Sequence, residues 1–454
     1  MQNNSSSNRH GLTSDEAKAL CDKILGFAKA GHTRVNINSG WRGFTRTATN
    51  KVTSAGGSED VTVQISSVFG KRVATVKTNR LDDAALTKAV RDSESLARLA
   101  PENPEYMPEL GAQQYTTVRG YYDTTGGLTT ETRARAAALA IEAAKKSDTV
   151  AAGFMDVDAS SQAVATSGGL FAYQARTGVA STLTARTADG LSSGWAGDEA
   201  ADWNTIESER IAQDAVRKCQ EWKNKTALEP GRYEVVLEPT AAGMLMLRLM
   251  GVFDARQADE GRSYFAKQGG NRLGEQVFDP KVTIYSDPAE PNAETNPFTS
   301  AGIPVRRQVW IQNGVLKTVS YSRFWADKKG TAPIPAMSNL VMNGGSASVD
   351  DMVRSIQRGV LITRFWYIRG LNARTISQTG LTRDGTFLIE NGKISRPVTN
   401  FRFNQSLVEL LQKVDMLGRP TRVCASESSS VSSPIVVPAM KVRDFFLASV
   451  SDAI

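Results

Sequence analysis

The sequence predicts an α+β protein of several domains, in which helices pack on antiparallel sheets. Its 454 residues exceed the size at which one hydrophobic core usually stops growing. Apolar residues recur with a helical period in some stretches and alternate with polar residues, as in strands, in others. The pairs Asn313-Gly314 and Asn391-Gly392 predict β-hairpins. We therefore expect a disordered N-terminus (1–12), an N-terminal α/β domain with helices on an antiparallel sheet (13–110), a central α+β region (111–228) and a β-rich C-terminal domain (229–454).

The N-terminal domain is predicted to contain two helices around a β-hairpin. Acidic residues just after a Thr-Ser pair mark the start of the first helix, because they suit a first helical turn. Three closely spaced prolines after the second helix end it. The expected elements are a helix over residues 13–30 capped by Thr13 or Ser14, strands over 60–66 and 72–78 joined at Gly70-Lys71, and a helix over 79–96 capped by Asn79.

The central region is predicted to place helices against a sheet. An alanine-rich stretch favours a long helix, and glycines separate several short β-like segments after it. The pair Gly168-Gly169 lacks the surrounding pattern of a phosphate-binding loop, so it predicts a hairpin turn. The expected elements are a helix to residue 146 capped by Thr129 or Thr130, strands over 150–157, 163–166, 171–175 and 180–186, and a helix over 205–223.

The C-terminal domain is predicted to be mainly β. A strand over residues 233–238 is interrupted by Pro239, and Thr240 is expected to cap a helix that runs to about residue 256. That helix is apolar on most sides, which predicts a buried structural element. Further strands are expected over 305–309, 315–321, 385–390 and 394–398, with turns at Asn313-Gly314 and Asn391-Gly392.

Histidine and cysteine are scarce, and this excludes several mechanisms. The two histidines are His10 and His32, so the rest of the chain lacks the usual neutral-pH base and zinc ligand. A Ser-His or Cys-His hydrolase is therefore not expected. Cys21, Cys219 and Cys424 lie far apart, which predicts reduced thiols and no disulfide framework or cysteine cluster. The polar start and the short apolar runs predict a cytoplasmic protein without a membrane span.

Positive charge is concentrated in one segment. The whole chain has a net charge of +7, whereas residues 354–422 hold twelve Lys and Arg against four acids, a surplus of eight. Such a segment, with aromatic residues nearby, is compatible with an acidic peptide, a partner protein or nucleic acid. We favour a solvated face combined with structural arginines, and do not expect nucleic acid, because no nucleic-acid recognition motif accompanies the charge.

Five motifs occur in an order that is more specific than any of them alone. They are FTRTATN (44–50), KTNRLDDAAL (77–86), DEGRSYF (259–265), LGEQVFDPKVTI (273–284) and TGLTRDGTFLIENGKISRPV (379–398). Together they resemble the TldD/PmbA (TldE) family, over about residues 13–454. The resemblance implies an N-terminal α+β region, a central region and a β-rich C-terminal domain, which agrees with the predicted organisation.

The resemblance also implies a zinc site in catalytic TldD subunits, made by an HExxxH helix and a cysteine near the C-terminus. Two ligands from a helix and one from elsewhere leave an open position for water, and the glutamate takes its proton. In this chain Leu247 stands at the first histidine, Arg248 at the glutamate and Val252 at the second histidine. Leucine and valine cannot coordinate zinc, and arginine cannot accept a proton. We therefore expect no catalytic residue and no zinc in this chain.

Other metal-ligand candidates are incomplete. Cys424 resembles the position of the zinc-binding cysteine, but one thiolate does not make a zinc site, so a buried cysteine is the favoured interpretation. Asp254, Asp259, Glu260 and Glu275 offer oxygens without the pattern of a carboxylate metal site.

The resemblance therefore implies a TldE-like, non-catalytic subunit of a TldD/TldE zinc metallopeptidase. It implies a heterodimer with a TldD-like partner that holds the zinc, while this chain completes a cavity for unfolded or flexible peptides. We expect peptide capture by β-strand addition, and a role for residues 354–422 in facing the partner or guiding acidic peptides, tested by charge reversal at Arg364, Arg369 and Arg374. Two alternatives stay open: a stand-alone or homodimeric hydrolase, using Cys424 or carboxylates, and a regulatory binder of the gyrase-modulator type.

Overall fold

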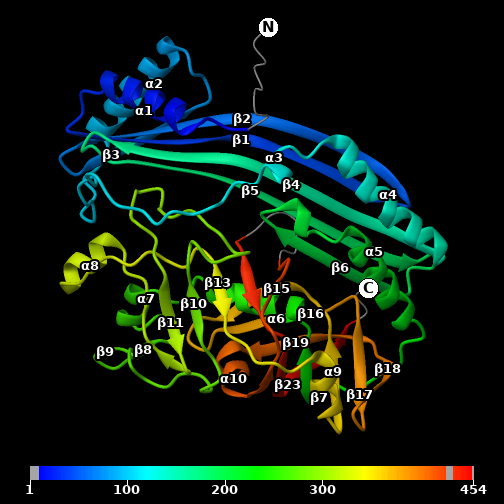
Figure 1. Ribbon diagram of the computed structural model, residues 1–454. Coiled ribbons are helices and arrows are strands. Elements are labelled where there is room, and N and C mark those ends of the chain that lie inside the picture. Colours follow the sequence, from blue (N-terminus) through cyan, green and yellow to red (C-terminus); the bar gives the residue numbers. More distant parts are fainter. Residues whose placement is uncertain (1–9, 426–432, 452–454) are drawn as a thin grey trace.

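The protein combines a long curved sheet with a β-rich domain that lies against it (Figure 1). This computed structural model describes residues 10–425 and 433–451. The mixed helix and strand content confirms the predicted α+β class. Residues 1–9 of the predicted disordered N-terminus lie outside the described residues. Of the remainder, the His10 ring stacks on Trp41 at 4.8 Å and the Leu12 amide donates to Ser39 Oγ at 2.7 Å.

The curved sheet has six antiparallel strands in the order β3-β2-β1-β4-β5-β6. Its central pairing joins β1 to β4, so strands from both sides of residue 110 belong to one sheet. On each strand, successive side chains point to opposite faces of this sheet. The strands are β1 (His32–Ala48), β2 (Lys51–Phe69), β3 (Arg72–Thr78), β4 (Thr149–Thr166), β5 (Phe171–Thr187) and β6 (Ser193–Ala200).

Helices cover one face of this sheet, and the other face meets the C-terminal domain (Figure 1). Buried apolar residues of α1 and α2 pack on Val35, Ile37 and their neighbours. On the opposite face the side-chain amide of Asn36 donates to the Ser300 carbonyl at 2.7 Å. The helices are α1 (Ser14–Phe27), α2 (Asp83–Leu99), α3 (Asp123–Gly126), α4 (Thr130–Lys146) and α5 (Ser208–Glu221), with a 3-10 turn, η1 (Trp203–Thr205).

The C-terminal domain contains two larger sheets and a two-stranded ribbon. One sheet has the order β15-β16-β19-β23-β7-β14-β17-β18, with β20 paired to β23, and the other has the order β12-β11-β10-β13-β22-β21. The strands of the first are β7 (Gly231–Leu237), β14 (Arg358–Ile362), β15 (Phe365–Asn372), β16 (Ser377–Thr382), β17 (Thr386–Glu390), β18 (Lys393–Pro397), β19 (Asn400–Ser406), β20 (Val414–Leu417) and β23 (Met440–Ser451). The others are β10 (Ile284–Ser286), β11 (Gln308–Gln312), β12 (Val315–Leu316), β13 (Leu340–Met342), β21 (Thr421–Arg422) and β22 (Ile435–Val437), with β8 (Ala266–Lys267) and β9 (Gly270–Asn271) in the ribbon.

A short buried helix, α6 (Pro239–Met246), packs against β22 in this domain. Its residues from Ala241 to Met246 are all buried, as the apolar sequence predicts. The remaining helices are η2 (Leu247–Leu249), α7 (Ala255–Asp259), α8 (Arg323–Lys329), α9 (Val349–Arg354) and α10 (Leu407–Gln412). No helix of the described residues is long and apolar enough to cross a membrane.

Local sequence signals predict turns and caps well. Thr13 forms a capping box with Glu16, and Thr129 caps α4. In the two predicted turns, Asn313-Gly314 and Asn391-Gly392, both residues have positive φ, as a type I′ hairpin turn requires, with Asn313 at 49° and Gly314 at 76°. Gly169, also at positive φ, lies in the turn between β4 and β5, which confirms the hairpin.

Several predicted elements are wrong in extent. The segments 150–157 and 163–166 form one strand, β4, and 171–175 and 180–186 form β5. Polar side chains in the middle of β4 do not mark a turn, because they have partners on other segments: Ser161 pairs with Ser39 and Gln162 with Asn296. Strands β1 and β6 have no counterpart in the prediction. The second helix begins at Asp83 and is capped by Asp82, not Asn79. The helix expected over residues 240–256 ends at Met246, with Pro239 at its first turn instead of Thr240 as its cap.

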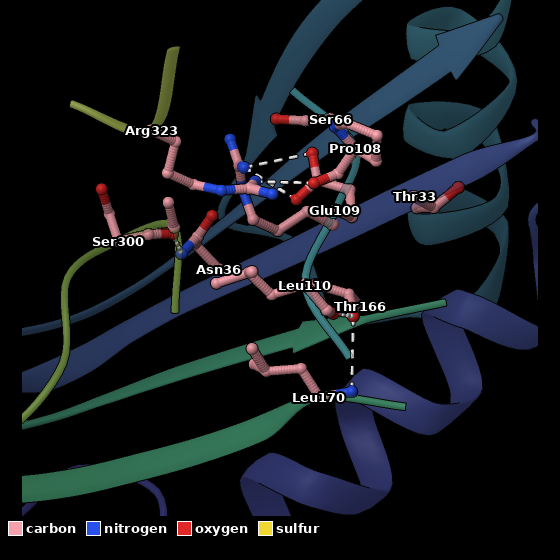
Figure 2. A network of polar contacts seen from close by, with 12 residues as sticks. Thr33, Asn36, Ser66, Pro108, Glu109, Leu110, Thr166, Leu170, Ser300 and Arg323 are labelled. Atoms are coloured by element: carbon pink, nitrogen blue, oxygen red, sulfur yellow. Dashed lines mark hydrogen bonds and ion pairs between the residues drawn. The ribbon is translucent and has the colours of Figure 1, made fainter. Parts of the chain in front are cut away.

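A polar network joins the sheet, the connecting segment and the C-terminal domain (Figure 2). Arg34 Nη1 on β1 lies 2.9 Å from a carboxylate oxygen of Glu109, whose side chain is 4% exposed. Thr166 Oγ1 donates to the Leu110 carbonyl at 2.6 Å, and Arg323 Nη1 donates to the Pro108 carbonyl at 2.6 Å. Residues 108–110 therefore hold the two parts of the molecule in a defined arrangement.

Candidate functional site

The segment 247–252 belongs to the apolar packing of the C-terminal domain. After α6 ends, Leu247–Leu249 forms one turn of 3-10 helix. Leu249 is fully buried, and Leu247, Met250 and Val252 are partly buried against the same core. Arg248 is half-buried between them. These side chains offer no imidazole, thiolate or carboxylate, so their chemistry does not fit zinc ligation.

Cys424 lies in a segment that packs directly on α6. Gly243 of α6 faces this segment: a Cβ added to it would lie 2.4 Å from Val423 Cγ2 and 3.7 Å from Ala425 Cβ. Residues on both sides of Cys424 therefore lie against this helix. Cys424 is 1% exposed, and Cys21 and Cys219 are also buried free thiols. Burial raises the pKa of Cys21 to about 12, which keeps that thiol protonated. The serine-rich residues 426–432 after Cys424 lie outside the described residues.

The four carboxylates considered as metal ligands have structural partners. Asp254 accepts a hydrogen bond from the backbone N–H of Gln257 at 2.7 Å and caps α7. Glu275 lies 2.7 Å from Lys267 Nζ. Asp259 accepts from Trp325 Nε1 at 2.9 Å, and Glu260 pairs with Arg256 and Arg262. Within residues 10–425 and 433–451, no group of three or more His, Cys, Asp or Glu side chains is arranged to hold a metal ion.

A cavity of about 860 Å³ lies between the curved sheet and the C-terminal domain. Its walls come from β6, α5, the first residues of α6, β13 and the strands β21 and β22. Two of these strands, β6 and β21, are the last strands of their sheets. Residues that line it include Trp195, Glu199, Lys218, Glu238, Tyr285 and Arg422.

The cavity is lined by paired charges. Lys218 Nζ lies 2.6 Å from Glu238 Oε2, just before α6, and Arg422 lies 3.5 Å from Glu199 on β6. The second pair is the more buried, since its side chains are 10% and 1% exposed. Asp198 pairs with Arg210 at 3.1 Å, yet burial raises the pKa of the Asp198 carboxyl above its usual range. The cavity wall is therefore polar and carries ion pairs, whereas the segment 247–252 packs in an apolar core.

The arginines of the basic segment do not share one surface. Arg364 is 5% exposed at its side chain, and its Nη1 lies 2.8 Å from Asp384, which is 1% exposed. Arg369 and Arg374 are exposed. Charge reversal at all three therefore tests a surface only at Arg369 and Arg374, because reversal at Arg364 breaks a buried ion pair. The expectation of structural arginines holds for Arg364 and for Arg422.

Sequence reasoning did not find the cavity. Its residues come from segments as far apart as Trp195 and Val436, and no local spacing connects them. The sequence predicts Glu238 at the end of a strand, Pro239 as its interruption and Thr240 as a helix cap, although all three residues also line the cavity. The one sequence signal for this cavity is the abrupt change from the polar residues before the helix to the apolar helix itself.

Comparison with known proteins gives two domain matches. Residues 230–449 match the PmbA/TldA metallopeptidase C-terminal domain, and residues 128–220 match the PmbA/TldA metallopeptidase central domain. The two matches together cover more than half of the chain.

Relatives with curated names are metalloproteases. The chain is 27% identical over 326 residues to a metalloprotease of Methanothermobacter thermautotrophicus, covering 64% of this chain and 68% of that protein. It is 26% identical over 254 residues to a metalloprotease TldD homolog of Haemophilus influenzae, covering 52% of each. The chain thus matches about half the length of the second relative.

Solved structures share the fold over nearly the whole chain. A candidate modulator of a DNA gyrase from Thermotoga maritima has a TM-score of 0.84 at 21% identity, covering 95% of this chain and 99% of that one. TldE from Thermococcus kodakarensis has a TM-score of 0.83 at 18% identity, with the same coverage. At these identities the likeness establishes the fold.

Proposed function

Because this chain belongs to the TldD/PmbA family, we propose that it is the non-catalytic, TldE-like subunit of a TldD/TldE-type zinc metallopeptidase. The observation that carries the proposal is the apolar packing of residues 247–252. Leu247 and Val252 lie against the hydrophobic core at the positions where the family's zinc ligands are expected. The zinc and the general base then belong to a TldD-like partner in a cytoplasmic heterodimer.

The role left to this chain is to bind part of an unfolded or flexible peptide. The cavity of about 860 Å³ is within the range of ligand-binding pockets, roughly 300–1,000 Å³, and the terminal strands β6 and β21 contribute to its walls. A peptide that adds a strand at such an edge is held by main-chain hydrogen bonds, which demand no particular sequence. The paired charges of the wall then orient the chain without selecting one side chain.

The division of labour is tested by reconstitution. We expect the purified chain alone to hold no stoichiometric zinc and to show no chelator-sensitive cleavage of an unfolded peptide. Addition of a TldD-like paralogue from the same genome is expected to give a stable complex, one zinc per heterodimer and cleavage. Glutamine in place of the partner's HExxxH glutamate should abolish cleavage and leave the complex intact.

The alternative functions give different outcomes in the same assays. A stand-alone or homodimeric hydrolase cleaves the peptide without the paralogue, and a Cys424→Ala variant then distinguishes a thiol mechanism from a carboxylate mechanism. A regulatory binder of nucleic acid shows salt-dependent binding to DNA. Cleavage by the chain alone would overturn the non-catalytic assignment.

A further inference from the structure

A small cavity lies between α4, α5 and the curved sheet. Its volume is about 30 Å³. Thr45 of β1, Arg133 of α4 and Ser208, the first residue of α5, line it together with small and apolar residues. A buried water needs at least about 10–15 Å³ of such space, so this cavity has room for one or two waters or for a single small ion.

Each of these three residues has a buried polar side-chain atom without a hydrogen-bond partner among the described residues. The atoms are Thr45 Oγ1, Arg133 Nε and Ser208 Oγ. Thr45 is 3% exposed and Arg133 is 2% exposed, so bulk solvent does not reach them. Buried polar groups are normally hydrogen-bonded. One N–H and two O–H groups around the same cavity therefore point to a bound species that accepts from all three.

Arg133 brings a buried positive charge to the cavity. Its Nη1 donates to the Leu128 carbonyl at 3.1 Å and its Nη2 donates to Thr130 Oγ1 at 3.2 Å, and both acceptors are neutral. Its guanidinium carbon lies 5.3 Å from the Trp41 ring centroid. No carboxylate within residues 10–425 and 433–451 forms an ion pair with Arg133, and burial lowers its pKa. A buried cation without a counter-ion is costly, so the charge favours an anion over a water molecule.

The N-terminal end of α5 adds to this preference. Its N-cap residue, Glu207, makes no capping hydrogen bond, and the Glu207 carboxylate instead lies 2.6 Å from Arg210 Nε at an exposed position. The first N–H groups of a helix have no partner within the helix, and the helix dipole makes this end positive. Ser208 belongs to this first turn and lines the cavity. Helix N-termini of this kind favour bound anions.

The types of donor indicate a single-atom anion. Thr45 and Ser208 each offer one hydroxyl, and Arg133 offers its Nε–H, whereas its Nη1 and Nη2 already donate to other groups. A carboxylate or phosphate is bound best by two parallel N–H groups of one guanidinium. Three single donors from three different elements suit instead a spherical ion, which accepts equally from every direction.

We propose that the cavity between Thr45, Arg133 and Ser208 binds a halide-sized monovalent anion, which joins α4 and α5 to the curved sheet. The site goes beyond the proposed peptide-binding function and does not depend on it. Because α5 also supplies Arg210 and Lys218 to the wall of the large cavity, the anion fixes the position of the helix that carries this wall.

The test compares thermal unfolding of the full chain in sodium chloride and in sodium gluconate at equal pH and ionic strength, which holds charge screening constant. Replacing gluconate by chloride should raise the Tm of the wild type by about 2 °C more than that of Arg133→Gln or Thr45→Val. The difference between wild type and variant removes the general effect of each salt on stability. Thr45→Val keeps the shape of the side chain, so it tests the site even if Arg133→Gln does not fold. The control Arg135→Gln, at an exposed arginine on the same helix, should respond like the wild type.

A crystal of the full chain soaked in bromide locates the ion, and we expect anomalous density beside Arg133, Thr45 and Ser208. The same response to chloride in wild type and Thr45→Val overturns the proposal and assigns the cavity to water. Bromide density without a chloride response in solution reflects binding at crystal concentration only, and also overturns it. A larger Thr45-dependent rise in Tm with phosphate than with chloride assigns the site to an oxyanion and overturns the halide assignment.

Discussion

The two ends of α6 have opposite environments. The N-terminal end, at Glu238 and Thr240, lines a polar cavity and carries an ion pair to Lys218. The C-terminal end continues into Leu247 and Leu249, which pack in the hydrophobic core. Only eight residues separate these environments. The difference indicates that one short helix can have a charged cavity wall at one end and apolar core packing at the other.

Loss of packing at the apolar end of α6 is expected to have the largest effect. Leu249→Ala deletes a fully buried side chain and should lower the free energy of unfolding by about 2–5 kcal/mol. Urea denaturation measures the change. Leu371→Ala, at a leucine that is 57% exposed, is the control and should stay within about 0.5 kcal/mol. Similar losses for both would contradict the assignment of residues 247–249 to the core.

A methyl group inserted between α6 and the Cys424 segment is expected to have the next largest effect. The added Cβ of Gly243→Ala meets Val423 Cγ2 at 2.4 Å, so overpacking should cost about 1–3 kcal/mol. Gly251→Ala has open space within 4 Å and serves as the matched control. Thermal unfolding of both variants checks the prediction. An unchanged Tm for Gly243→Ala would show that Val423 moves aside without a cost in stability.

The polar end should respond in binding more than in stability. Lys218→Gln removes an ion pair whose side chains are 12% and 20% exposed, so we expect a stability loss of about 1 kcal/mol or less. The same change alters the charge of the cavity wall and should weaken binding of a labelled unfolded peptide, measured by fluorescence anisotropy. A large destabilisation with unchanged binding would reverse the roles given to the two ends.

The smallest expected effect is a pH dependence at Asp198. Because burial raises its pKa in the folded state, its contribution to stability is present at low pH and is lost as pH rises through the folded pKa. Asp198→Asn should therefore gain stability relative to wild type at pH 7, and this gain should shrink as pH falls toward 4. Urea denaturation across this range measures it, and a gain that grows on acidification would contradict the sign.

Signals confined to a few neighbouring residues predicted local structure well. The capping residues Thr13 and Thr129, the strand Arg72–Thr78 and both Asn-Gly turns agree with the structure, because each depends on backbone preferences within one turn. The change from polar to apolar at Pro239 also marked a real helix start. These features need no knowledge of distant contacts.

Features set by distant contacts were not predictable in this way. Polar residues in the middle of β4 resemble a loop in sequence, because their partners lie far along the chain: Ser161 pairs with Ser39 and Gln162 with Asn296. The apolar run after Met246 has no period that shows where the helix ends. A charge count treats Arg364 like any surface arginine, yet its partner Asp384 and its stacked Trp195 place it in the interior.

The β1–β4 pairing has a consequence for biosynthesis. Its closest partners in sequence, Thr47 and Gly153, are 106 residues apart, and this pairing forms the middle of the curved sheet. A ribosome therefore releases β1, β2 and β3 well before β4 exists, and β1 then carries an unpaired edge. We expect the curved sheet to complete its folding only after the chain has been synthesised to about residue 166. Until then the exposed edge of β1 is a site where we expect chaperones to bind.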